Sequence, residues 1–304
     1  MDRRLIGGLL FAVALTAAVV LPALPGVRLQ GVASTIALPD DPQVGDCVLG
    51  SGPGLPVIPP DESPAPPAPT FAPCDGRPVA GEVAAVVRAT GDDRSRLEQA
   101  AASGVDCGQS SLEYSGLLLD DGRFVMSDSA PDDPVSWNLS INMRTAWVLP
   151  APLLQSAGRT WVACVVTPAT GGAYLGRLAG AFDNGALPDE FGLCWEKDAP
   201  SIDSVSCASR HLGELMATAA IPDGGKVAVA DIMSSCRRLV ARVIGRSDPT
   251  AGGRLTVEVS LTPDVAQFLT LPQPLRVVCS IAPVAQALSG TVVGLRDRPI
   301  PYAG

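Results

Sequence analysis

The sequence predicts an α+β fold in which an N-terminal transmembrane helix is followed by two duplicated, small, disulfide-stapled α+β halves. Three observations lead to this prediction: a long uncharged N-terminal run, eight cysteines that divide four and four, and short motifs that recur in the same order in both halves. With 304 residues, of which 47% are hydrophobic, the chain is long enough to bury one large core or two small ones.

The N-terminal run is long enough to cross a bilayer. After Arg3 and Arg4, no charged residue occurs from position 5 through position 27, and a membrane span needs about 20 apolar residues. Because basic residues stay on the cytoplasmic side, residues 1–27 are predicted to be a single-pass anchor that crosses the cell membrane through residues 5–27. The alternative is a cleaved signal peptide and a secreted body. Residues 28–42 then form a stalk, and the body is extracytoplasmic in either case.

Eight cysteines in an exported chain favour four disulfides. The alternative, structural zinc, usually shows Cys-x-x-Cys pairs, whereas the two cysteines nearest in this sequence are Cys194 and Cys207. In chain order the cysteines are Cys47, Cys74, Cys107, Cys164, Cys194, Cys207, Cys236 and Cys279.

The two groups of four cysteines lie among matching motifs, which indicates an internal duplication. In each half a glycine stands near the first cysteine, and the second cysteine precedes a Gly-Glu pair that opens an apolar run (Gly81-Glu82 and Gly213-Glu214). The fourth cysteine is followed by a Gly-x-apolar-x-Gly segment, interpreted as a strand end or bend, at 176–180 and 290–294. We therefore place one repeat at residues 43–182, with an extended proline-rich loop at 51–73, and a second at 183–304.

Each half is expected to fold as several short strands around one helix, and this pattern predicts the α+β class. The helical stretches at 92–107 and 229–240 carry the third cysteine of each half. Short β-branched or alternating runs at 82–87, 160–166 and 275–281 predict strands.

The charge of the chain excludes two classes of partner. The net charge is -9 and the isoelectric point is about 4.6. No basic stripe is available to neutralise nucleic-acid phosphates or to dock on anionic lipid. Nucleic acid is therefore not an expected partner.

The stretch SVSCASRHLGEL (204–215) holds the only histidine and offers the best candidates for chemistry. Cys207, His211 and Glu214 could form a nucleophile with its base, a metal or pH-sensing site, or a disulfide cysteine beside two bystanders. The matching stretch of the first half has the cysteine and the Gly-Glu pair but no histidine, and the even number of cysteines leaves no spare thiol. We therefore favour the disulfide and predict no enzyme activity, no metal and no cofactor.

Other catalytic arrangements have less support. The acidic pairs Asp120-Asp121 and Asp132-Asp133 could serve glycoside hydrolysis, but both lie in turn-like segments and aromatic residues make up only 4% of the chain. The sequence contains no Gly-x-Ser-x-Gly elbow, no P-loop and no His-Glu-x-x-His motif.

With these motifs in place, the chain resembles the septum-formation family of actinobacterial envelope proteins, as two degenerate copies over roughly residues 43–295. Gly45-Asp46-Cys47 resembles the start of that domain, and Cys207, His211 and Glu214 resemble its Cys and His-x-x-Glu element. Cys74 and Glu82 match the same element without the histidine. The third and fourth elements match Pro152, Gln155, Gly158, Arg159, Trp161 and Cys164. The second copy departs from the pattern, because Phe191-Gly192-Leu193-Cys194 replaces the Gly-Asp-Cys start.

The resemblance implies an exported, membrane-tethered domain with a link to cell division or cell-wall assembly. We therefore expect a non-enzymatic interaction or scaffold module whose partners are envelope or membrane proteins. The alternatives are a binding module for a cell-wall glycan, peptide or lipid, and a thiol- or carboxylate-dependent hydrolase. The repeated cysteine order predicts that the first cysteine of each half pairs with the second and the third with the fourth: Cys47–Cys74, Cys107–Cys164, Cys194–Cys207 and Cys236–Cys279.

Overall fold

The structure, a computed structural model, describes residues 38–49, 69–117, 135–185, 187–196, 205–221, 227–262 and 275–304. Asp41–Gly304 form one compact unit. The predicted anchor, most of the predicted stalk and the acidic pairs at 120–121 and 132–133 lie outside the described residues. Within the described ranges, no helix is both long and apolar enough to cross a membrane.

The predicted fold class, α+β halves behind a transmembrane helix, is wrong. Two antiparallel sheets make up most of the described structure, and the described α-helices number five, of which only α6 (Val229–Ile244) is longer than ten residues. The helix expected at 92–107 is shorter than predicted: α2 spans Asp93–Ala102, Gly104 follows it with a φ of 83°, and a separate helix, α3 (Cys107–Ser115), begins at the last residue of the predicted stretch. Such a left-handed residue ends a helix.

Five strands form the first sheet, in the order β2-β1-β3-β6-β5. Their bounds are β1 (Asp46–Leu49), β2 (Thr70–Pro73), β3 (Gly81–Arg88), β5 (Met143–Val148) and β6 (Trp161–Pro168). Strand β2 occupies the end of the stretch expected to be a proline-rich loop, so the loop prediction is wrong for residues 70–73.

The second sheet follows the same order, β8-β7-β9-β11-β10. Its strands are β7 (Leu193–Trp195), β8 (Val205–Ser206), β9 (Gly213–Ile221), β10 (Leu255–Thr262) and β11 (Leu275–Pro283). The order along the chain also matches. Helices α2 and α3 lie between β3 and β5 of the first sheet, and α6 lies between the equivalent strands of the second, β9 and β10.

The two sheets share even an irregularity of register. Between β3 and β6 the pairing skips Ala84, two residues after Glu82. Between β11 and β9 it skips Met216, two residues after Glu214. A β-bulge at the same place in two sheets is a specific feature rather than a defect. It sets a residue-by-residue correspondence in which Glu82 matches Glu214; the repeat boundaries at 182 and 183 stay a prediction.

Strand β4 (Asn138–Leu139) links the two sheets, because it precedes β5 of the first sheet but pairs with Thr218 and Ala217 on β9 of the second. Strand β4 pairs with a later part of β9 than β7 does, since β7 pairs only with Gly213 and Glu214. The second sheet therefore contains six strands among the described residues.

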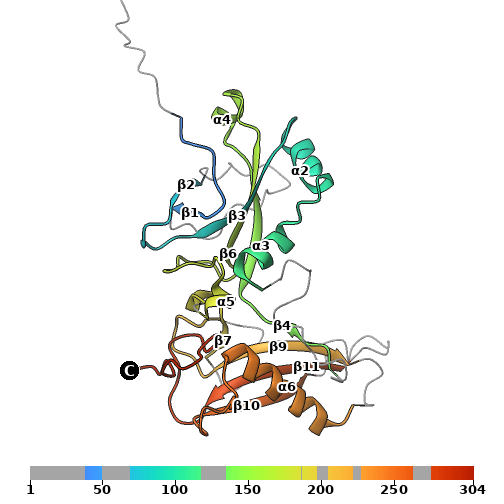
Figure 1. Ribbon diagram of the computed structural model, residues 1–304, viewed down its shortest axis with the longest axis vertical. Coiled ribbons are helices and arrows are strands. Elements are labelled where there is room, and N and C mark those ends of the chain that lie inside the picture. Colours follow the sequence, from blue (N-terminus) through green and yellow to red (C-terminus); the bar gives the residue numbers. More distant parts are fainter. Residues whose placement is uncertain are drawn as a thin grey trace, which may run out of the picture. The chain divides into compact units, whose positions relative to one another are not determined.

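Each sheet has a helix packed on it (Figure 1) that a disulfide ties to a strand, Cys107–Cys164 from α3 to β6 and Cys236–Cys279 from α6 to β11. Helix α3 contacts β3 and β6, and α6 contacts β10 and β11. The apolar residues of α6 recur every three or four positions and are buried, which is typical of an amphipathic helix on a core. The remaining described helices are α4 (Pro152–Ser156), α5 (Ala181–Asn184) and the 3₁₀ turn η2 (Asp189–Phe191).

All eight cysteines are joined, in the pairs Cys47–Cys74, Cys107–Cys164, Cys194–Cys207 and Cys236–Cys279. These are the pairs that the repeated cysteine order predicts. Such a density of disulfides indicates an extracytoplasmic protein, because cytosolic thiols are kept reduced.

Gly81 tests the close packing of β3 on β6. A methyl group at this position would lie 2.5 Å from the backbone oxygen of Val166, and backbone cannot move aside as a flexible side chain can. Gly81→Ala is expected to lower the free energy of unfolding by about 1–3 kcal/mol, measured by denaturant titration with disulfides intact. The control is Gly108→Ala in α3, which meets only the Asp106 side chain and should leave stability unchanged or raise it slightly. Equal losses in the two variants would contradict the steric explanation.

Candidate functional site

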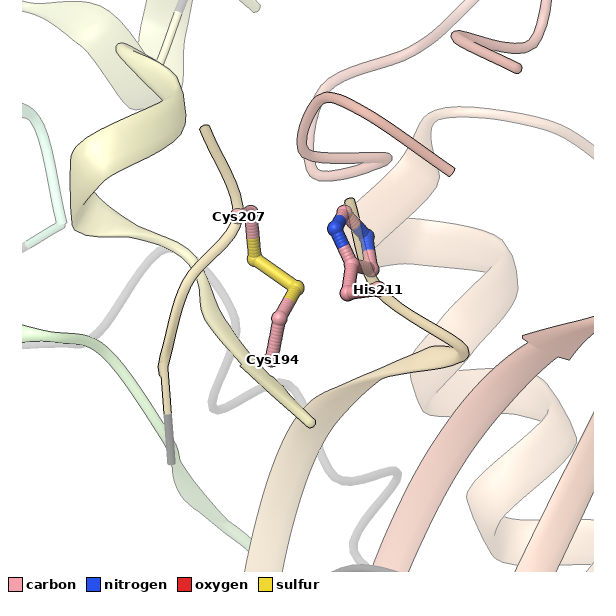
Figure 2. Close-up of side chains that lie close together, drawn as sticks. All are labelled: Cys194, Cys207 and His211. Atoms are coloured by element: carbon pink, nitrogen blue, oxygen red, sulfur yellow. A yellow bond between two sulfur atoms is a disulfide. The ribbon is translucent and has the colours of Figure 1, made fainter. Parts of the chain in front are cut away.

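The structure brings His211 beside the Cys194–Cys207 disulfide (Figure 2). All three residues are buried, and one ligand-type atom from each lies within 4.8 Å of the others. Because the two sulfur atoms are bonded to one another, neither is a thiolate that could attack a substrate or bind a metal. With the disulfide formed, a Cys207–His211 dyad would have no thiolate nucleophile, and a metal site would have no thiolate ligand.

His211 is held by the backbone on both sides. Its N–H donates to the carbonyl of Leu288 at 2.9 Å, and the N–H of Leu288 donates back to the carbonyl of His211 at 2.9 Å. In the ring, Nδ1 lies 2.7 Å from the carbonyl oxygen of Ser209, so it carries the proton and donates. The other nitrogen, Nε2, is buried and meets no hydrogen-bonding partner in the part of the chain that the structure describes.

Burial lowers the pKa of His211, against smaller opposing effects from the Ser209 carbonyl and the Asp189 carboxylate. The imidazole is therefore neutral at physiological pH. With an exposed fraction of 1%, it has no access to a substrate.

The first sheet has a valine where the second has this histidine. Val79 and Tyr174 exchange the same two backbone hydrogen bonds as His211 and Leu288, and Val79 stands three residues before Glu82 as His211 stands three before Glu214. A branched apolar side chain fills the equivalent position, so the fold does not require an imidazole there.

Glu214 is fully buried and holds a loop from the end of the chain. Its carboxyl group accepts from Thr291 Oγ1 at 2.5 Å and from the backbone N–H of Val292 at 2.7 Å. These two residues belong to the glycine-flanked segment 290–294. Burial raises the pKa of Glu214 to about 7, the two hydrogen bonds lower it and the Asp189 carboxylate raises it further. No ion pair of Glu214 with a cation occurs within the described ranges.

The equivalent Glu82 holds the equivalent loop but has more partners. It accepts from the backbone N–H of Leu178 at 2.6 Å, as Glu214 does from Val292. It also accepts from Tyr114 Oη at 2.5 Å and Tyr174 Oη at 2.9 Å, and it forms an ion pair with Arg177 at 3.2 Å. A buried carboxylate needs such donors or a cation to offset its lost hydration.

Asp189 completes the arrangement around Glu214. It accepts from the N–H of Thr291 at 2.7 Å, and burial raises its pKa. The backbone of Gly192 packs directly against Cys207 Sγ, and a methyl group there would overlap that sulfur and lie 2.9 Å from Glu214 Oε1. The disulfide, the glycine and the carboxyl group therefore form one packed unit.

Sequence reasoning singled out Glu214, the Gly-Glu pairs and the glycine-flanked segments, but it interpreted the segments only as strand ends or bends. The structure shows that each segment donates a backbone N–H to the buried glutamate. Asp189, Thr291, Tyr114, Tyr174 and Arg177 were missed. The available signal was that both motifs recur in both halves in the same order, which points to a shared role but not to the contact between them.

Comparison of the chain with protein-family models, with curated proteins and with solved structures finds no match in any of the three. The resemblance to the septum-formation family therefore rests on the sequence motifs alone.

The buried Glu214 carboxyl predicts a pH-dependent stability. Its pKa is 4.5 in an unfolded chain and about 7 in the fold, so the folded state binds the proton more tightly. The stabilisation is fully present below pH 4.5 and is lost as the pH rises through about 7. The expected loss is on the order of 3 kcal/mol.

We expect Glu214→Gln to remove this dependence. The measurement is the free energy of unfolding of the parent chain and the variant from pH 4.5 to 8, taken as a difference so that other titrating groups cancel. Relative to the parent, the variant should gain stability as the pH rises. A difference that stays constant over this range would contradict the assignment.

His211→Val tests whether the imidazole is needed. Because Val79 fills the equivalent position, we expect the variant to match the parent near pH 7 within about 1 kcal/mol. It should become relatively more stable below pH 6.5, because the folded parent resists protonation of the imidazole. His211→Ala is the control and should cost about 2 kcal/mol or more by leaving a cavity. Thermal unfolding at pH 5 and pH 7 distinguishes these outcomes.

Proposed function

We propose that this protein is a non-enzymatic extracytoplasmic module that acts in the cell envelope through interactions with other envelope or membrane proteins. One observation carries the proposal: the residues most capable of chemistry occupy structural positions that the first sheet repeats. Cys207 is bonded to Cys194, as Cys74 is to Cys47. Glu214 holds a loop as Glu82 does, and His211 stands where Val79 stands.

The burial of this cluster supports the same proposal. Cys207 and Glu214 each have an exposed fraction of 0%, and His211 has 1%. A catalytic group must come within hydrogen-bond reach of the atom that reacts, which these side chains do not. A hydrolase that used them would first have to open the packing around Gly192 and reduce a disulfide. The link to division or cell-wall assembly rests on the motifs shared with the septum-formation family.

The experiment is complementation of a strain from which the encoding gene has been deleted. One allele carries His211→Val together with Glu214→Gln, and a second carries Cys194→Ser together with Cys207→Ser. Under the proposal, the first allele restores growth and septum morphology as the parent allele does, while the second fails because it is unfolded. Secreted protein level and non-reducing peptide mapping serve as folding controls. If the first allele is folded at normal level but does not complement, the cluster is functional and the proposal is wrong.

A further inference from the structure

A pocket of about 330 Å³ opens on the second sheet, outside the cluster described above. It is lined by Trp195, Leu212, Glu258 and the segment 282–287, which contribute from β7, the start of β9, β10 and the end of β11. This volume is at the small end of the range for small-molecule sites, about 300–1,000 Å³. It fits one side chain or a small molecule rather than a polymer.

The side chains on the face of the second sheet that carries the pocket differ from those at the equivalent positions of the first sheet. Trp195 pairs with Gly213 as Val48 pairs with Gly81, so the indole stands where the first sheet has a valine. Glu258 pairs with Ser280, one residue beyond Cys279, as Ala146 pairs with Val165, one beyond Cys164. The carboxylate therefore stands where the first sheet has an alanine.

In the first sheet this face is sealed by its own apolar side chains. Val48 and Ala146 belong to a buried cluster that also contains Val83, Val148, Trp161, Ala163 and Val165. By register, residues 260, 276 and 280 of the second sheet correspond to Val148, Trp161 and Val165, and they are a serine, an arginine and a serine. Val83 and Ala163 keep apolar counterparts, Leu215 and Val278, so the second sheet has lost part of the apolar cluster and gained a pocket with one aromatic wall and one charge.

The charged group of the pocket has no partner within the described part of the chain. The side chain of Glu258, on an exposed position of β10, makes no ion pair or hydrogen bond there. Trp195 is only 5% exposed and its ring packs over Gly213, so the indole is a fixed wall of the pocket. Val284 at the pocket is 61% exposed and adds apolar surface.

We propose that this pocket binds a primary ammonium group on an apolar stem, of the kind that a lysine-like side chain of a peptide presents. Glu258 is the only ionisable residue in the lining, so the pocket favours a cation and disfavours an anion. The alanines, Val284 and Trp195 would contact the stem, and the indole ring is a favourable surface for an ammonium group. A neutral sugar would find few of the hydrogen-bonding groups that orient such ligands. The inference goes beyond the proposed interaction role, and either can fail without the other.

The experiment is a nuclear magnetic resonance titration of the ¹⁵N-labelled, disulfide-intact protein, in which the indole signal of Trp195 reports binding. The signal is assigned as the one missing from Trp195→Val, which restores the residue of the first sheet. The probes are N-acetyl-lysine amide, N-acetyl-norleucine amide, which lacks the ammonium group, and N-acetylglucosamine. Ligands of this size bind with dissociation constants on the order of 1 mM.

We expect the lysine derivative to shift the Trp195 signal and to bind about fivefold more tightly than the norleucine derivative. Glu258→Gln should remove that advantage, about fivefold, without changing the rest of the spectrum. Glu196→Gln is the matched control, because it deletes a charge next to Trp195 but outside the pocket lining, and it should bind as the parent does. The proposal is wrong if the lysine derivative leaves the signal unmoved, if Glu258→Gln binds it equally well, or if either neutral probe binds as tightly.

Discussion

A buried carboxyl group that accepts a backbone N–H from a distant loop is the interaction on which both sheets depend. Glu82 and Glu214 open the central strand of their sheets, and the loops they hold follow the last strand. Each hydrogen bond therefore joins the beginning of a sheet to the chain that leaves it. A carboxyl group inside a protein is tolerated only when its oxygen atoms are satisfied, so the loop and the glutamate must be ordered together. The glycine before each glutamate belongs to the same constraint, since a side chain at Gly81 or Gly213 would overlap its neighbours.

The two sheets satisfy that constraint in different ways. Around Glu82 the chain supplies a guanidinium group and two phenols, and burial followed by the nearby Glu82 carboxylate raises the pKa of both Tyr114 and Tyr174, which keeps them protonated donors. Around Glu214 the described residues supply a hydroxyl and an amide, and a second carboxylate stands close by at Asp189. The sheets also differ on the face where the second sheet has its pocket. In the first sheet this face is a sealed apolar layer, whereas in the second it is a more polar surface with a pocket. The first sheet thus has the more fully satisfied carboxylate and, on the face that carries the pocket in the second sheet, the more apolar packing.

Much of this arrangement is legible in the sequence, although the fold class is not. Repeated spacing of cysteines and Gly-Glu pairs leads to the four disulfides and to a matched pair of units, because covalent and packing constraints act at fixed positions of a motif. The class prediction failed because two antiparallel sheets dominate the described residues and none of their helices could cross a membrane. The helical pattern at 92–107 covers α2 but misses α3, which starts only at Cys107, after Gly104 has ended the first helix. The role of the glycine-flanked segments also escaped, because a bond between residues 78 positions apart, as for Glu214 and Val292, leaves no local pattern. His211 drew attention as a reactive residue only because its place in the fold, opposite Leu288, is invisible without the pairing of strands.

Strand β4 has a consequence for the order in which the chain can fold. Its two residues come before β5 and β6 in the chain, yet they pair with β9, whose partners Ala217 and Thr218 follow about eighty positions later. A chain that has emerged only as far as β6 can assemble the first sheet, but it must leave β4 without its neighbour until β9 arrives. Pairings across such a sequence separation form late, because the intervening loop must close first. The two sheets are therefore not independent domains. If the chain were cut between them, the edge of β9 would be left unpaired in one piece and β4 would have no pairing partner in the other. Only the two sheets together form a complete folding unit.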